Sequence, residues 1–158
     1  MPAILLSDFS HVLLLPKDPL YSGGLNALHR KLVTERGKDY DVFEYFELNR
    51  TLLDFYGTLR SRYVIGVFTT DTVQDHPQIR PALDKVCHRI IAAADHGLSK
   101  RDPVAYTFVA KEFGSAPQTV IYLDDDQDNV AAATAAGMSA IQYRSNEEAI
   151  PLLSSLMR

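Results

Sequence analysis

Residues 119–138 read TVIYLDDDQDNVAAATAAGM and combine an apolar run, an acidic cluster and an alanine-rich segment. Its apolar, β-branched start at 119–123 predicts a strand that is buried on both faces. Residues 126–137 then predict a helix that begins among acids, where the helix dipole favours negative charge, and ends at Gly137. A buried strand that leads directly into a helix is the repeating unit of a parallel α/β sheet.

The same alternation continues on both sides of this unit. Further strands are expected at 3–7, 63–68, 89–94 and 139–143, with a short strand or hairpin arm at 12–16. Helices are expected at 24–36, at 41–62 with a break capped by Asn49, at 102–114 and at 145–157. The sequence therefore predicts a single domain over 1–158 with a Rossmann-like parallel sheet between two layers of helices. Between residue 8 and the strand at 63 no strand is expected beyond 12–16, so roughly 17–48 is predicted to be a small helical insertion above the sheet.

Composition narrows the class of protein. The 158 residues carry a net charge of −4 and have no long basic run, which argues against nucleic acid as the main partner. The one cysteine, Cys87, cannot form an internal disulfide, so a reducing, cytoplasmic location is expected. Asp8 interrupts the apolar start and no basic segment precedes it, so neither a signal peptide nor a membrane span is predicted. Oligomeric state stays open.

Polar side chains follow the predicted strands where each of them ends. They are Asp8 after the first strand, Thr69 and Thr70 after the second, Lys100 a short loop after the third, and Asp124, Asp125 and Asp126 after the fourth. The carboxyl ends of parallel strands form the ligand-binding edge of an open α/β sheet. These side chains are therefore expected to converge.

Phosphoryl transfer is the chemistry that suits this set. A carboxylate can attack phosphorus and form an aspartyl-phosphate, and Mg²⁺ takes one or two carboxylates together with phosphate oxygens. Asp8 and Asp125 are candidate Mg²⁺ ligands, with the main-chain carbonyl of Ser10 as a third. Lys100 and Thr69, with its neighbour Thr70, are candidates to bind the transferring phosphoryl oxygens, whose charge must be neutralised.

Each of these residues also has a purely structural interpretation. An aspartate after a strand is often a turn former or helix cap, and residues 124–128 can be a solvated loop that leads into the first turn of a helix. Lys100 can be an ordinary surface lysine. However, three consecutive carboxylates repel one another, and a bound cation is the simplest reason to hold them together.

Taken in order, LSDFSHVL, GVFTT, GLSKRDPVAY and IYLDDDQDNVAAATAAGM resemble the motifs of the haloacid dehalogenase-like (HAD) superfamily. The resemblance implies the HAD core with a reduced cap, and a small phosphorylated molecule as substrate. It also implies that Asp8 is the nucleophile, Thr69 the phosphate-binding hydroxyl and Lys100 the phosphate-neutralising lysine, and that Asp124 and Asp125 are the metal-binding pair. Receiver domains of two-component signalling use similar residues, but their acidic pair precedes their lysine.

Ser10 and His11 depart from the pattern, because most HAD phosphatases have Asp and Gly there. That second aspartate protonates the leaving group and then activates water, whereas a serine hydroxyl cannot exchange a proton near neutral pH. The first hypothesis is therefore a Mg²⁺-dependent phosphatase or phosphotransferase that works slowly through an aspartyl-phosphate at Asp8. The alternative is a non-catalytic HAD-fold protein that binds a phosphorylated ligand or a protein partner. His11 is a further acid–base candidate, although a lone histidine is more often structural or exposed.

Overall fold

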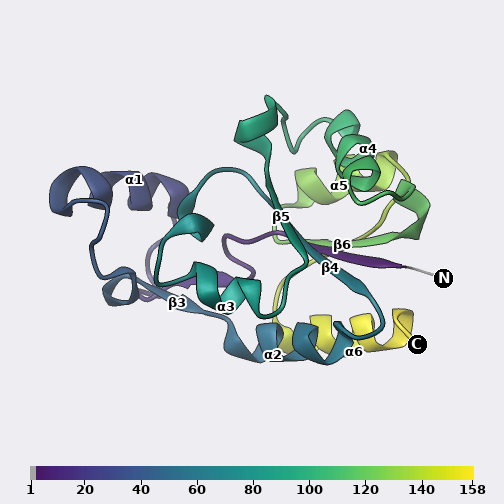
Figure 1. Ribbon diagram of the computed structural model, residues 1–158, viewed down its shortest axis with the longest axis horizontal. Helices are drawn as coiled ribbons and strands as arrows, with labels where there is room; N and C mark the ends of the chain where they lie inside the picture. The colour runs from purple at the N-terminus through teal and green to yellow at the C-terminus, as the bar shows by residue number, and fades with distance from the viewer. Residues whose placement is uncertain (1–2) are drawn as a thin grey trace.

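A computed structural model describes residues 3–158 (Figure 1). Five parallel strands form the central sheet in the order β5-β4-β1-β6-β7. These strands are β1 (Ile4–Ser7), β4 (Val64–Thr69), β5 (Arg89–Ala92), β6 (Val120–Asp124) and β7 (Ser139–Gln142). All five lie where the sequence predicts them.

β1 is the middle strand, hydrogen-bonded to β4 on one side and to β6 on the other. Leu5 is aligned with Ile65 of β4 and with Ile121 of β6, so three buried apolar residues lie side by side across the sheet. After β1, the chain places β4 and β5 on one side of it and then β6 and β7 on the other side. The carboxyl end of β1 therefore lies at the point where the direction of winding reverses, which is where open α/β sheets bind ligands.

Helices cover both faces of the sheet, as predicted (Figure 1). Leu5, Ile65 and Ile121 face one layer, formed by α2 (Arg50–Leu59), α3 (Arg80–Asp84) and α6 (Asn146–Leu156). Leu6 and Tyr122 face the other layer, formed by α4 (Pro103–Glu112) and α5 (Gln127–Ala135). This alternation follows from the period of two in a strand. No helix within residues 3–158 has the length and apolar character that crossing a bilayer requires.

Two predicted helix boundaries are confirmed with their side-chain chemistry. Asn49 caps α2, because its side-chain oxygen accepts a hydrogen bond from the amide of Leu52 at 3.2 Å. Gly137 follows α5 with φ of 102°, a conformation that side chains rarely adopt, and a Cβ there would lie 2.7 Å from Nε2 of Gln118. The residue type therefore fits the helix end at both positions.

The segment 17–48 differs from the expectation of helices alone. It contains α1 (Leu25–Arg36), a 3-10 helix (Val42–Glu44) and strand β3 (Phe46–Leu48), which pairs antiparallel with β2 (Leu14–Pro16). The prediction of a helix from residue 41 onward, and of no strand beyond 12–16, is therefore wrong. Phe46 and Leu48 are buried while Glu47 is exposed, the alternation of a strand, and Leu14–Pro16 supplies the backbone partner. Figure 1 shows α1 and β3 beyond the end of the sheet at which β1 finishes.

Candidate active site

Asp8 is the first residue after β1, and its backbone is held from two sides. Its amide donates to the carbonyl of Leu123 in β6 at 2.8 Å, which extends the sheet ladder by one residue. The hydroxyl of Ser7 donates to the carbonyl of Asp8 at 2.8 Å, and the hydroxyl of Tyr56 donates to Ser7 at 2.9 Å. The backbone is thus fixed at the sheet edge while the carboxylate, on a residue that is 6% exposed, lines a cavity.

The acids that follow β6 divide into two roles. Asp124 is fully buried and accepts hydrogen bonds from the hydroxyl of Tyr122, from the amide of Asp126 at 2.9 Å and from Nδ2 of Asn129 at 3.1 Å. Asp126 instead caps α5, because its side chain accepts from the amide of Asp128 at 2.9 Å. Asp125 is partly buried, and its carboxylate lies with those of Asp8 and Asp124, with one oxygen from each within 4.8 Å of the others. Asp126 therefore has the structural role of a helix cap, whereas Asp124 and Asp125 are the candidates for binding a metal.

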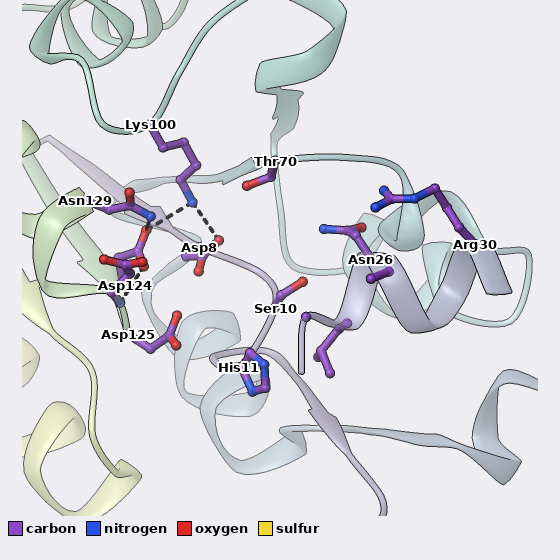
Figure 2. Close-up of a pocket in the computed structure, with 14 residues that line it drawn as sticks. Asp8, Ser10, His11, Asn26, Arg30, Thr70, Lys100, Asp124, Asp125 and Asn129 are labelled. Atoms are coloured by element: carbon purple, nitrogen blue, oxygen red, sulfur yellow. Dashed lines mark hydrogen bonds and ion pairs between the residues drawn. The ribbon is translucent and has the colours of Figure 1, made fainter. Parts of the chain in front are cut away.

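Lys100 is buried between the two strand ends rather than exposed on a loop. Its Nζ donates to Oδ1 of Asp8 at 2.7 Å and lies 3.0 Å from Oδ2 of Asp124 (Figure 2). It also donates to the carbonyl of Phe68 at 3.1 Å. The hydroxyl of Tyr106 fixes its backbone by donating to the carbonyl of Lys100 at 2.7 Å. Because Lys100 is only 6% exposed and its ammonium group contacts three acceptors, its side chain is held in one conformation.

Burial and like charge perturb the acids strongly. Burial, together with the charges of Asp124 and Asp125, raises the pKa of Asp8 to about 8, although Lys100 opposes the shift. Burial and the charge of Asp124 also raise the pKa of Asp125. Burial acts in the same direction on Asp124, but Lys100 and the hydrogen bond from Tyr122 outweigh it and lower the pKa of Asp124. Burial lowers and the two carboxylates raise the pKa of Lys100, and the carboxylates prevail. The single positive charge of Lys100 therefore does not neutralise the three carboxylates.

The donor set fits Mg²⁺. Three carboxylates within reach of one another supply the hard oxygen ligands that Mg²⁺ prefers, and a divalent ion would relieve the repulsion that raises the pKa values of Asp8 and Asp125. No other group of three or more potential His, Cys, Asp or Glu ligands of this kind is found within residues 3–158.

The two threonines after β4 occupy different environments. The hydroxyl of Thr69 is buried and has no hydrogen-bond partner within residues 3–158, while Thr70 lines the cavity (Figure 2). β4 ends at Thr69, so Thr70 is the first residue of the loop that follows the strand. Of the two candidates for a phosphate-binding hydroxyl, Thr70 is the one that the structure places at the cavity wall, and the role of either remains a prediction.

Ser10 and His11 form the opposite wall from Lys100. The hydroxyl of Ser10 lines the cavity and lacks a partner in the described part of the chain. His11 has φ of 62°, the one positive value among the non-glycine residues described, and its Nε2 lies 3.3 Å from the carbonyl of Gly23. This left-handed conformation is normally taken by glycine, and a histidine there costs about 1–2 kcal/mol.

The cavity has a volume of about 350 Å³, and its far wall comes from α1. Asn26 and Arg30, one turn apart on that helix, line it together with the backbone around Gly24. Asn26 and Arg30 are not among the site residues predicted from the sequence. Two polar residues four positions apart on a helix are too common to indicate a ligand-binding site. Asn129 is a further site residue that is not among the candidates from the sequence. It lies in α5, which follows β6, and it donates a hydrogen bond to Asp124.

The sequence profile of the haloacid dehalogenase-like hydrolases matches residues 15–137 of this chain. No protein of curated function matches the chain in sequence. Several solved structures share the fold. A HAD family enzyme from Bacteroides thetaiotaomicron, in complex with magnesium and inorganic phosphate, has a TM-score of 0.67 and 14% identity over 100% of both chains.

A predicted HAD-like family hydrolase from Porphyromonas gingivalis has a TM-score of 0.70 and 18% identity, covering 100% of this chain and 98% of that one. A 2-haloacid dehalogenase from Pseudomonas syringae pv. Tomato DC3000 has a TM-score of 0.64 and 15% identity, covering 94% and 88% respectively. At these identities the structural similarity describes the fold only.

Proposed function

We propose that this chain, which belongs to the haloacid dehalogenase-like hydrolase family, is a Mg²⁺-dependent phosphatase or phosphotransferase. It acts on a small phosphorylated molecule through an aspartyl-phosphate at Asp8. The observation that carries the proposal is the group of three carboxylates, with Lys100 bound to two of them, at the carboxyl end of the central strand. A cavity of about 350 Å³ lies at the small end of ligand pockets and suits a substrate of few atoms.

The acidic group also favours phosphorus over carbon as the point of attack. A hydrolase that displaces halide from carbon needs one nucleophilic carboxylate, and further acids beside it would only repel that nucleophile. Phosphoryl transfer uses a divalent ion, which the acids can hold. When bound, Mg²⁺ would be held by Asp8, Asp124 and Asp125, with the carbonyl of Ser10 as a further ligand, and would neutralise charge on the phosphoryl oxygens.

In the first step, an oxygen of the Asp8 carboxylate attacks phosphorus as the bond to the leaving oxygen breaks. Lys100, which donates to Asp8 at 2.7 Å, orients the nucleophile and lies beside the phosphoryl oxygens. Thr70 adds a hydroxyl at the same wall. The leaving oxygen departs with both electrons of its bond to phosphorus, and it needs a proton unless its conjugate acid is already strong.

In the second step, water attacks the phosphorus of the aspartyl-phosphate and releases inorganic phosphate and the Asp8 carboxylate. Both steps need a group that exchanges protons, and the hydroxyl of Ser10 cannot supply or accept one near neutral pH. Acyl and aryl phosphates, whose leaving groups need little protonation, should therefore label Asp8 in a burst. Dephosphorylation should be slow for every substrate.

Ser10 also supports the second candidate, a protein that binds a phosphorylated ligand or a protein partner without turnover. The hydroxyl of Ser10 has no hydrogen-bond partner among residues 3–158 and cannot exchange a proton near neutral pH. Under this alternative, the aspartate at position 8 holds metal and ligand but does not react.

Phosphate release and trapped phosphoenzyme separate the two candidates. The purified protein is incubated with Mg²⁺ and either acetyl phosphate or 4-nitrophenyl phosphate, quenched in acid, and examined by mass spectrometry of the peptide that contains Asp8. We expect a burst and a phosphorylated peptide, both absent in Asp8→Asn and retained in Asp54→Asn, which changes an exposed carboxylate on α2. If Asp8→Asn releases phosphate as fast as the unchanged protein, the proposal is wrong.

A further inference from the structure

The wall of the cavity that faces the acids is built by one side of α1. Asn26 and Arg30 extend from this helix toward Asp8, Ser10 and Thr70 (Figure 2). They are four residues apart, so they lie one above the other on the same face. The smaller residues Gly24 and Ala27 complete this wall and leave the space in front of the two polar side chains open.

This wall presents hydrogen-bond donors. The side-chain oxygen of Asn26 accepts from the amide of Val73 at 3.4 Å, which turns its NH₂ group toward the cavity (Figure 2). A guanidinium has five N–H donors and no acceptor. Among the described residues that line the cavity, the cations are Lys100, which is enclosed by its three acceptors, and Arg30, whose side chain is 62% exposed.

Arg30 already binds a carboxylate at this position. One of its terminal nitrogens is paired with Asp71, which lies in the loop directly after Thr70, and within residues 3–158 it has no other partner. The remaining N–H donors of the guanidinium have no side-chain partner within residues 3–158. The planar fork of arginine matches a carboxylate through two parallel hydrogen bonds.

We infer that Arg30, assisted by Asn26, recognises a carboxylate on the substrate. The substrate class is then a small phosphorylated carboxylic acid, with its phosphoryl group at Asp8 and Lys100 and its carboxylate at α1. Asp71 holds the guanidinium in place, and its negative charge weakens the attraction between Arg30 and the substrate carboxylate. This inference rests on the proposed function, because it assumes that the phosphoryl group binds at Asp8.

The matched pair of ligands that tests the inference is phosphonoacetate and phosphonoacetamide. Both carry a phosphonate that cannot be hydrolysed, and they differ only in a carboxylate against a neutral amide of the same size. Binding is measured by isothermal titration calorimetry in excess Mg²⁺, so the readout does not depend on turnover. Inorganic phosphate is titrated separately to report on the phosphoryl site alone.

We expect the unchanged protein to bind phosphonoacetate about tenfold more tightly than phosphonoacetamide, the preference that charge-assisted hydrogen bonds provide. Arg30→Met should abolish the preference, because phosphonoacetate loses a charge-assisted hydrogen bond and phosphonoacetamide loses only a weaker neutral one. Arg36→Met is the matched control, because Arg36 lies at the other end of α1, is 56% exposed and pairs with Glu44. It should retain the full preference.

Asp71→Asn provides a test that does not remove the arginine. Releasing the guanidinium from its internal partner should increase the preference for phosphonoacetate. Equal binding of the two ligands by the unchanged protein, or an unaltered preference in Arg30→Met, overturns the inference and leaves the proposed function standing. If neither ligand nor inorganic phosphate binds in the presence of Mg²⁺, the proposed function fails and the inference fails with it.

Discussion

Replacing Ser10 with aspartate and His11 with glycine should convert a slow phosphoenzyme into one that turns over. The Ser10 hydroxyl lines the cavity beside Asp8 and has no partner in the described residues, so a carboxyl group at this position reaches the same space. The neighbouring Asp8 and Asp125 carboxylates should raise the pKa of the new acid, as the charge of Asp125 raises the pKa of Asp8. A carboxyl with a raised pKa can both donate and accept a proton near neutral pH.

The size of the effect follows from the missing step. General acid–base catalysis contributes about 10²–10⁴-fold, which is roughly 3–5 kcal/mol of barrier. We expect about 10²-fold faster phosphate release, the lower end, because the surrounding residues are not arranged around the new acid. Glycine at position 11 should also remove the roughly 1–2 kcal/mol cost of holding a histidine at φ of 62°, which offsets part of the added charge repulsion.

The assay is stopped-flow release of 4-nitrophenol together with continuous detection of phosphate at saturating Mg²⁺. In the unchanged protein the nitrophenol burst should precede slow phosphate release, whereas in the double variant both should proceed at one steady rate. Ser10→Asn with His11→Gly is the matched control, because asparagine has the size of aspartate and cannot exchange the proton.

Two results would refute the reasoning. If the asparagine control turns over as fast as the aspartate variant, proton transfer at position 10 is not the missing step. If neither variant nor the unchanged protein forms a phosphoenzyme, the site does not act on phosphate esters at all.

Without metal, the melting temperature should fall as the pH rises from about 5 to about 8, because the raised pKa of Asp8, about 8, lets the folded protein keep a proton that the unfolded chain has lost. Millimolar Mg²⁺ should reduce this dependence of the melting temperature on pH, because it binds the ionised acids. The reduction should be smaller in Asp125→Asn, and differential scanning fluorimetry measures both. Burial raises the pKa of the Cys87 thiol to about 12, so a disulfide reagent at pH 8 should react with it only at the rate of unfolding, and much faster in urea. Asn49→Ala removes the cap of α2 and the buried hydrogen bonds to the Val12 carbonyl and the Tyr143 hydroxyl. The free energy of unfolding, measured by urea titration, should fall by about 2–4 kcal/mol, and an unchanged midpoint would contradict this.

The strands of the sheet and the place where the acids gather could both be predicted from the sequence. Strands buried on both faces are visible as short apolar runs such as 119–123, because burial on both sides leaves no polar alternation. The acids at 8 and 124–125 follow such runs directly, and parallel strands bring their carboxyl ends to one edge whatever the loops do. Local caps were equally readable, since Asn49 and Gly137 act through their own backbone neighbours.

Features that depend on a partner far away in the sequence could not be predicted from it. Phe46–Leu48 carries a pattern short enough for either a helix or a strand, and its pairing with Leu14–Pro16 made it a strand. Which of two adjacent threonines lines the cavity depends on where β4 ends and on how the chain turns after it: Thr69 ends the strand, and Thr70 begins the loop at the cavity wall. Arg30 has no local signal at all: it became a candidate ligand because the chain that leaves β1 returns α1 to the edge of the sheet where Asp8 lies. Side chains that act from an insertion are placed by packing between segments far apart in sequence, and local sequence patterns do not encode that packing.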